Sequence, residues 1–108
     1  MALESVANGT QTATVTSEHT LATETVAGYY TLVVDTVNMV ADDVLILKLK
    51  TKALSGGVSR LAYQAMFAHV QEEKIKYSVP VPVDVEIVAT LTQSEGTSRD
   101  FPWSLLKS

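Results

Sequence analysis

The stretch IKYSVPVPVDVEIVATL, at residues 75–91, decides the fold class of this chain of 108 residues. Every odd position in it is apolar, and every even position except Val88 is polar or proline. Successive side chains of a β-strand point to opposite faces of the sheet, so a period of two predicts an extended chain with one buried face. The stretch therefore predicts an all-β protein.

This stretch is too long to form one straight strand in a domain of this size. Its residues, at about 3.3 Å each, would extend roughly 56 Å, whereas a compact chain of this length has a diameter of about 35 Å. Pro80 and Pro82 lack N–H donors and, being two residues apart, would withhold them from the same neighbouring strand. We predict two strands, at about 74–79 and 84–93, joined by a stiff connector at a sheet edge, a crossover or a polyproline-like bridge. In any of these places, Pro80 and Pro82 are candidates for contact with another protein.

Further strands are predicted on both sides of this stretch. Residues 29–36 are apolar on both faces, which is typical of a central strand covered on each side. Residues 44–52 alternate, and Ser55-Gly56-Gly57 then favours a tight reversal. With weaker patterns at 10–16, 17–26 and 101–106, the chain is expected to form about six to eight short strands in an antiparallel β-sandwich or jelly roll.

Residues 60–72 are ambiguous between strand and helix. Ala, Met, Gln and Glu favour a helix, while Leu61, Tyr63, Ala65, Phe67 and His69 alternate as in a strand. We predict a strand because the preceding Gly-Gly turn requires a returning partner. The alternative is an α+β fold with a helix at about 60–72.

Composition predicts one domain and excludes several classes of function. We expect residues 1–9 to be a flexible N-terminal arm and residues 10–108 to be a single β-sandwich domain. The chain has no Cys, so thiolate nucleophiles and thiolate metal ligands are absent, and its net charge of −4 provides no basic field for nucleic acid. No stretch has the roughly 20 apolar residues of a membrane span, and the first residues do not form a secretory signal. We expect synthesis in a cytoplasm, with no nucleic-acid or membrane partner.

No group of residues predicts catalysis or a cofactor. His19 lies beside Ser17 and Glu18, but neighbours in sequence do not supply the geometry of a catalytic triad, and His69 continues a strand face. Asp35, Asp42 and Asp43 lack the alternating pattern of a calcium loop. We therefore expect no enzyme activity, no metal and no cofactor.

Two other sets of residues are candidates for contacts with proteins. Lys48, Lys50 and Lys52 form a cationic stripe that could meet an acidic neighbour, or that could protect an exposed strand from edge-to-edge pairing. Phe101 and Trp103 could close the domain's own core or enter a neighbouring subunit, and we favour the core. If Trp103 entered a partner's groove, a homo-oligomer would follow, most simply a trimer.

Three strings carry a resemblance to a known class: LVVDTVNMVADDVLILKLKTK at 32–52, SGGVSRLAYQAMFAHVQ at 55–71 and VPVPVDVEIVATLTQSEGTSRDFPW at 79–103. Over roughly residues 10–106 the chain resembles small virion proteins of tailed bacteriophages. The resemblance implies a β-sandwich or jelly roll that decorates or cements the capsid, or a head-to-tail connector or tail accessory subunit. It defines no functional residues.

The leading hypothesis is therefore a capsid decoration or cement protein, located in the virion and bound to the major capsid protein or to other virion subunits. The alternative is a connector or tail accessory protein, which a helix at 60–72 would suit better. A further alternative is a carbohydrate- or receptor-binding module that uses Tyr29, Tyr30, Tyr63 or Trp103.

Overall fold

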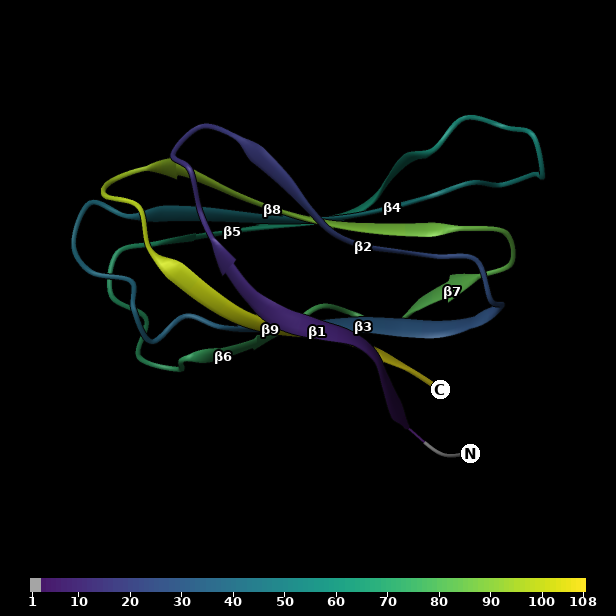
Figure 1. The fold of residues 1–108 in the computed structure, drawn as a ribbon, viewed down its shortest axis with the longest axis horizontal. Coiled ribbons are helices and arrows are strands. Elements are labelled where there is room, and N and C mark those ends of the chain that lie inside the picture. Colours follow the sequence, from purple (N-terminus) through teal and green to yellow (C-terminus); the bar gives the residue numbers. More distant parts are fainter. Residues whose placement is uncertain (1–2) are drawn as a thin grey trace.

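The computed structural model describes residues 3–108, and these residues form nine strands in two antiparallel sheets (Figure 1). The strands are β1 (Glu4–Thr12), β2 (Glu18–Glu24), β3 (Gly28–Asp35), β4 (Val44–Thr51), β5 (Arg60–Ala68), β6 (Ile75–Tyr77), β7 (Val81–Val83), β8 (Ile87–Glu95) and β9 (Asp100–Lys107). The predicted antiparallel β-sandwich is confirmed. The alternative with a helix at 60–72 is wrong, because β5 occupies most of that range and pairs with β4 along its whole length.

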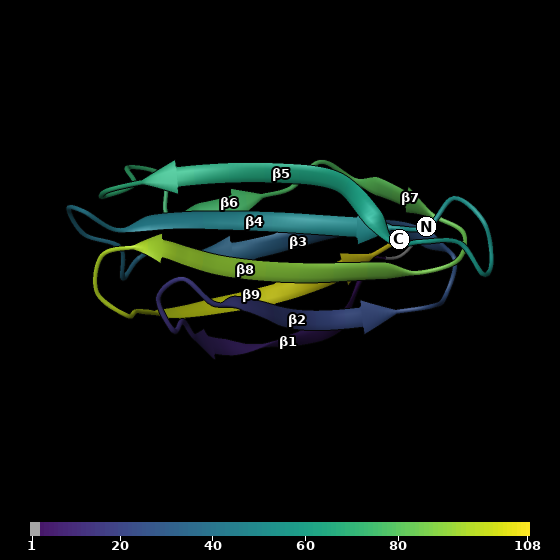
Figure 2. The ribbon, with the colours of Figure 1, turned by 90° about the horizontal axis from the view of Figure 1, so that it is seen from above.

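The two sheets have the orders β1-β9-β3-β6, with β7 also paired to β3, and β2-β8-β4-β5. Most connections cross from one sheet to the other, and they gather at the two ends of the sandwich (Figure 1). We call one end the polar end, formed by residues 13–17, 36–43, 69–74 and 96–99. The other is the pocket end, formed by residues 25–27, 52–59 and 84–86. Seen from above, β5, β6 and β7 lie along one side of the sandwich, and β1 and β2 lie along the other (Figure 2).

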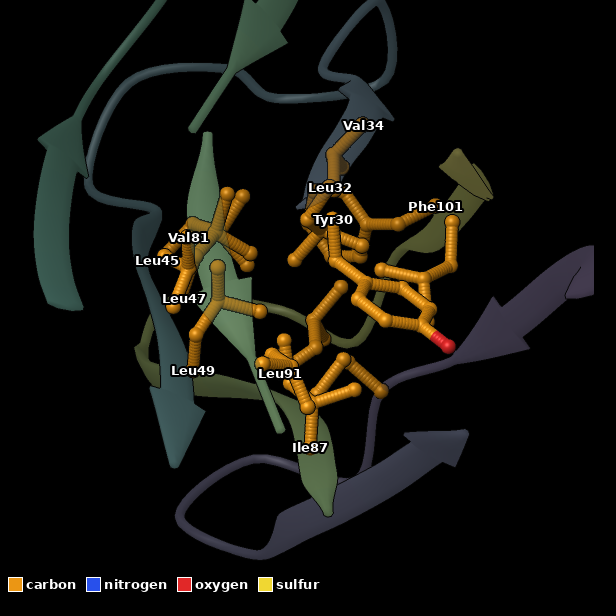
Figure 3. Packing of buried hydrophobic residues seen from close by; sticks show 14 of the residues in the cluster. Tyr30, Leu32, Val34, Leu45, Leu47, Leu49, Val81, Ile87, Leu91 and Phe101 are labelled. Carbon is orange, nitrogen blue, oxygen red and sulfur yellow. The ribbon is translucent and has the colours of Figure 1, made fainter. Parts of the chain in front are cut away.

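The core lies between the sheets and is built from the alternate residues that the sequence pattern selects. Leu45, Leu47 and Leu49 of β4 are at most 2% exposed and face Tyr30, Leu32 and Val34 of β3 across the interior (Figure 3). Phe101 and Leu105 of β9, and Ile87, Ala89 and Leu91 of β8, complete the centre. A buried aliphatic or aromatic side chain contributes about 1.5–3 kcal/mol by leaving water, so this alternation holds the two sheets together.

Only one face of β3 is covered, which corrects the expectation of cover on both sides. Tyr30, Leu32 and Val34 face the core, but Tyr29 on the outer face is 52% exposed. The strand is central in another sense, since it lies between β9 and the β6–β7 edge of the same sheet. A two-layer sandwich has no third layer to cover its outer faces.

The stretch at residues 75–91 is divided into shorter strands, as its length required. The divisions lie at residues other than those predicted. It contains three strands, β6, β7 and the start of β8, so the predicted boundary at residue 84 is replaced by a bend over residues 84–86. Pro82 lies within β7 opposite Tyr29, and β7 pairs with β3 alone, which confirms the expected sheet edge. Between β6 and β7, Ser78 maintains the pairing: its N–H donates to the Leu32 carbonyl at 2.8 Å, and its Oγ accepts the Leu32 N–H at 2.9 Å.

The first strand of the sandwich begins at Glu4, within the segment at residues 1–9 that we expected to be a flexible arm. Glu4 to Gly9 belong to β1 and pair with Lys107 to Trp103 of β9. The first two residues of the expected arm lie outside the described part of the chain. Backbone pairing with β9 explains why this polar segment is in the sheet despite its weak hydrophobic pattern.

Candidate interaction surface

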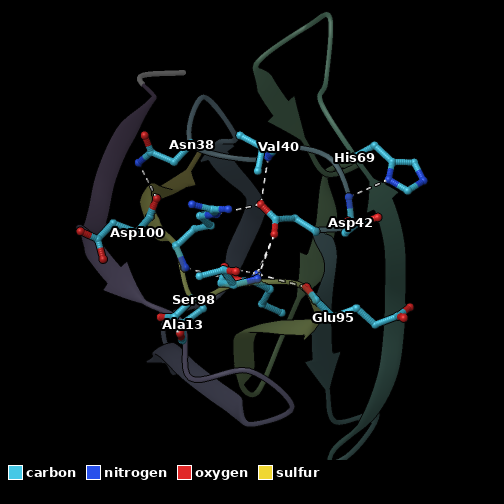
Figure 4. A network of polar contacts seen from close by, with 12 residues as sticks. Ala13, Asn38, Val40, Asp42, His69, Glu95, Ser98 and Asp100 are labelled. Carbon is cyan, nitrogen blue, oxygen red and sulfur yellow. Dashed lines mark hydrogen bonds and ion pairs between the residues drawn. The ribbon is translucent and has the colours of Figure 1, made fainter.

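The polar end is held together by the buried carboxylate of Asp43, whose side chain is 1% exposed. It accepts hydrogen bonds from Nε of Arg99 at 2.9 Å and from the backbone N–H groups of Val40 at 2.9 Å and Thr97 at 3.2 Å. The side-chain amide of Gln93 lies 3.4 Å from the same carboxylate and donates to the Thr97 carbonyl at 2.7 Å (Figure 4). These hydrogen bonds join the connection at residues 36–43 to β8 and to the connection at residues 96–99, so Asp43 forms a structural clamp between loops.

Burial alone would raise the pKa of Asp43 and is the largest single influence on it, but the donors around the carboxylate outweigh it. The Val40 N–H, the Arg99 side chain and the Thr97 N–H together hold the pKa of Asp43 below its ordinary value of 3.8. Asp43 is therefore a carboxylate in the folded chain, and its hydrogen-bonding capacity is used internally. It does not join Asp35 and Asp42 as a calcium ligand set.

Both histidines make hydrogen bonds that stabilise turns. Nε2 of His19 accepts the Thr14 N–H at 2.9 Å, and Nδ1 of His69 accepts the Asp42 N–H at 3.2 Å. No group of three or more His, Asp or Glu side chains within residues 3–108 is arranged to hold a metal ion. None of these residues forms a helix of the length and apolarity needed to cross a bilayer.

Lys48 and Lys50 lie on the interior strand β4 and Lys52 follows it, and the charges of Lys50 and Lys52 are neutralised within the chain. Nζ of Lys50 lies 3.1 Å from Glu18, and Nζ of Lys52 lies 3.8 Å from Glu86. A hydrogen bond from Thr90 and the ion pair with Lys50 lower the pKa of Glu18. Because β4 lies between β8 and β5, these lysines do not protect a free strand edge, as one interpretation required.

Phe101 and Trp103 lie in β9, which is not a tail but an interior strand between β1 and β3. Phe101 is completely buried in the core, as we favoured, and is inaccessible to a partner in the folded chain. Trp103 packs partly buried against the same core, and its indole borders Gly9 of β1, where an added Cβ would lie 3.6 Å from Nε1. The local pattern identified the apolar strand but not its central position.

Pro82 and Lys52 meet at the pocket end of the sandwich. They line a pocket of about 540 Å³ between the β4–β5 loop and β7, together with the exposed residues Leu54, Val58, Arg60 and Asp84. A smaller pocket of about 260 Å³ lies on the other side of Pro82 and Asp84, against Gly28 and Tyr29. Pro80 is exposed at the nearby edge, outside both pockets.

The β4–β5 loop exposes apolar side chains that the sequence analysis passed over. Leu54 is 74% exposed and Val58 is 66% exposed, on either side of the predicted reversal at Gly56. The signal was present in the sequence, since apolar residues in a Ser- and Gly-rich turn have no inward face to occupy. An apolar pocket with a few charged side chains at its rim has the composition of a protein contact site.

Tyr29, Tyr30 and Tyr63 do not share one surface, as the aromatic platform of a carbohydrate-binding module would require. Tyr30 is completely buried, and its hydroxyl donates to the Val26 carbonyl at 2.5 Å. Tyr63 is half-buried in β5, whereas Tyr29 is exposed beside Pro82. The aromatic residues are therefore divided among the core, a strand edge and an outer face.

The fold is similar to those of chains in virus particles. Over 97% of its length, this chain superposes on 31% of a chain in the structure of infectious bursal disease virus Gx strain, with a TM-score of 0.53 and 12% identity. A chain of T=1 particles derived from infectious bursal virus gives a TM-score of 0.55 at 12% identity, with 97% of this chain and 30% of that chain covered. The Gt strain of infectious bursal disease virus gives 0.52 at 13% identity, covering 97% of this chain and 32% of the other.

This chain therefore spans about a third of the length of those viral chains, and at such identities the likeness concerns the fold alone. No protein-family model and no curated protein matches the sequence.

Proposed function

We propose that this protein is a virion structural protein that decorates or cements a capsid through protein contacts and that it performs no catalysis. The observation that carries the proposal is the likeness of almost the whole chain to a portion of chains from virus particles. The resemblance of the sequence to small virion proteins of tailed bacteriophages supports the same class and adds the bacteriophage assignment. The partners would be the major capsid protein or other virion subunits.

We further infer that the sandwich is a jelly roll. The strand orders of the two sheets, β1-β9-β3-β6/β7 and β2-β8-β4-β5, place the first and last strands side by side, and every connection except β4–β5 and β6–β7 crosses between the sheets. Jelly rolls of two such sheets are widespread among viral capsid domains. The architecture thus suits a subunit whose task is to be held in a shell.

The pocket end is the surface that we assign to contact with the shell. It combines the exposed side chains of Leu54 and Val58 with Pro82 and the charged rim residues Arg60 and Asp84. At the opposite end, the buried carboxylate of Asp43 is occupied by internal hydrogen bonds, and neither of the two pockets lies there. Contacts of this modest size gain strength when many copies bind the same particle.

A decoration role is preferred to a connector or tail role because the feature that favoured the latter is missing. A helix at 60–72 would have suited a connector, and this segment contains β5.

Quantitative mass spectrometry of purified virus particles from the source of this sequence tests the proposal. A copy number close to that of the major shell protein is expected for decoration. Absence from the particle would overturn the virion role, and a handful of copies would overturn decoration in favour of the connector or tail role. Electron microscopy of the particles, with the protein removed as the matched control, would then locate it on the head or tail.

A further inference from the structure

We propose that β5 pairs with β5 of a second copy of this chain, antiparallel and about a two-fold axis at Ala65, which joins two sandwiches edge to edge. This inference concerns the purified chain and does not depend on which particle the protein enters. The feature that carries it is the contrast between β5 and the other strand edges.

The other edges have features that discourage pairing with another chain. The edge strand β6 has three residues and is followed by Pro80, and Pro82 interrupts the donors of β7. The edge strand β2 has a glutamate at each end and a register shift between them, and the exposed residues of β1 are Glu4, a glycine and neutral polar residues. Short length, proline, irregular pairing and charge are the usual protections of a free edge.

The edge strand β5 is long, as β1 is, but it differs from β1 and β2 in exposing large apolar side chains, Leu61 at 52% and Met66 at 66%. The strand has nine residues, its only charged residue is Arg60 at the start, and its register shift lies beside Ala62. Tyr63 to Ala68 are therefore regular, uncharged and paired on one side alone, to β4. Figure 2 shows β5 along the outside of its sheet, with no strand beyond it.

The side chains of this segment are complementary to those of a second copy when a two-fold axis at Ala65 relates the two strands. Residues directly opposite each other in an antiparallel pair share a face, so Tyr63 would face Phe67 of the second copy, and Gln64 would face Met66. Tyr63 and Phe67 both line the inner face and are only partly buried, so the pairing would cover two aromatic side chains in each copy. Met66, which is 66% exposed, would be covered on the outer face.

The charges also favour the antiparallel arrangement. It places the Arg60 end of each strand beside the Ala68 end of the other, from which the turn carrying the exposed Glu72 and Glu73 departs. A parallel pair would instead bring Arg60 against Arg60. Opposite charges near the two ends of the shared ladder therefore support a second copy of this chain as the occupant.

Sedimentation velocity of the purified chain over a concentration series tests the pairing. We expect a species of twice the 11.6 kDa chain mass to accumulate with concentration. Q64K/M66K places like charges in both outer cross-strand pairs and should weaken dimerisation by about tenfold or more. Q64K/M66E makes the same two pairs oppositely charged and should retain the dimer.

T20K/T23K is the matched control, because it adds two lysines to exposed positions on β2, the other edge of the same sheet. It should dimerise as the unaltered chain does, and circular dichroism should show that all four proteins are folded. An unaltered chain that remains monomeric would overturn the proposal. Equal loss of the dimer in Q64K/M66K and Q64K/M66E would overturn this register, and protection of β5 amides from hydrogen exchange only on whole particles would assign the edge to another virion protein.

Discussion

Asp43 and Arg99 are separated by 56 residues in the sequence, yet Nε of Arg99 lies 2.9 Å from the Asp43 carboxylate. The carboxylate is almost completely buried, while the arginine keeps 28% of its side chain exposed. The pair links the β3–β4 connection to the β8–β9 connection across the polar end. The Asp43 carboxylate accepts four hydrogen bonds in all.

Acidification should lower the free energy of unfolding, because it protonates Asp43. Because its folded pKa lies below the ordinary value of 3.8, Asp43 contributes stability above about pH 4 that is lost as the pH falls through the folded pKa. D43N should cost about 2–4 kcal/mol at neutral pH and reduce the pH dependence of the unfolding free energy below about pH 4. Urea unfolding at a series of pH values measures both effects.

D42N is the matched control for this prediction, because Asp42 is exposed and its φ of 77° is one that asparagine accepts. Part of the acid dependence should survive in D43N, since the pKa of Glu18 is also lowered, chiefly by a hydrogen bond from Thr90. Unchanged stability and unchanged pH dependence in D43N would contradict the clamp.

Gly96 should tolerate no side chain. Its φ is +98°, and an added Cβ would lie 2.1 Å from Oδ1 of Asp43 and 2.8 Å from the Asp43 Cα. G96A should therefore cost more than the roughly 1–2 kcal/mol of a left-handed alanine, because the Asp43 clamp must also move. G56A has a similar φ of +81° with nothing within 4 Å, so it isolates the backbone cost. Equal midpoints of urea unfolding for the two variants would refute the steric argument.

Removal of residues 101–108 should unfold the protein. The deletion takes away nearly all of β9, which joins β1 to β3, and with it the buried side chains of Phe101 and Leu105. F101A alone should cost about 3–5 kcal/mol. A truncated chain that kept its β-sheet circular dichroism spectrum would contradict the position of β9 and favour the alternative in which Phe101 and Trp103 enter a neighbouring subunit.

The pocket end should bind the particle without stabilising the fold. L54D alters a side chain that is 74% exposed, so its free energy of unfolding should change by less than about 0.5 kcal/mol. Binding to particles stripped of this protein should fall at least about tenfold, because a buried charge in the contact would be unpaired. V37D, at an exposed position on the polar end, is the control and should bind normally. Cosedimentation with stripped particles measures the difference.

The sequence pattern predicted which segments form strands better than it predicted which strands pair with one another. Alternation identified β3, β4 and β5 and the inward leucines, because these depend on burial of one face. The central position of β9 was not accessible, since it depends on pairing Trp103 with Gly9 and Val34, far away in the chain. The boundary near Pro82 was misplaced because Val81 to Val83 pair with β3 despite the missing donor of Pro82, so the chain bends at residues 84–86.

Among the candidate contact residues, too, the features that depend on local sequence were easier to predict than those that depend on distant residues. The edge position of Pro82 was predictable because a missing donor has a local signature, and Pro82 lines the pocket; its contact with another protein stays a prediction. The lysines were harder to interpret, since their ion pairs with Glu18 and Glu86 join separate strands and loops. Leu54 and Val58 were passed over, although apolar residues in a Ser- and Gly-rich turn have no inward face to occupy.

The pairing of Glu4 with Lys107 brings the two ends of the sandwich's chain onto adjacent strands, and both ends lie on the same side in Figure 1. A short linker could join them, and new ends could be opened at Gly56, where nothing crowds the backbone. Such a circular permutant would retain every strand pair of both sheets. The covalent order of the strands could then be changed while their spatial order is kept. Foreign peptides could therefore be inserted either in the linker or at Gly56.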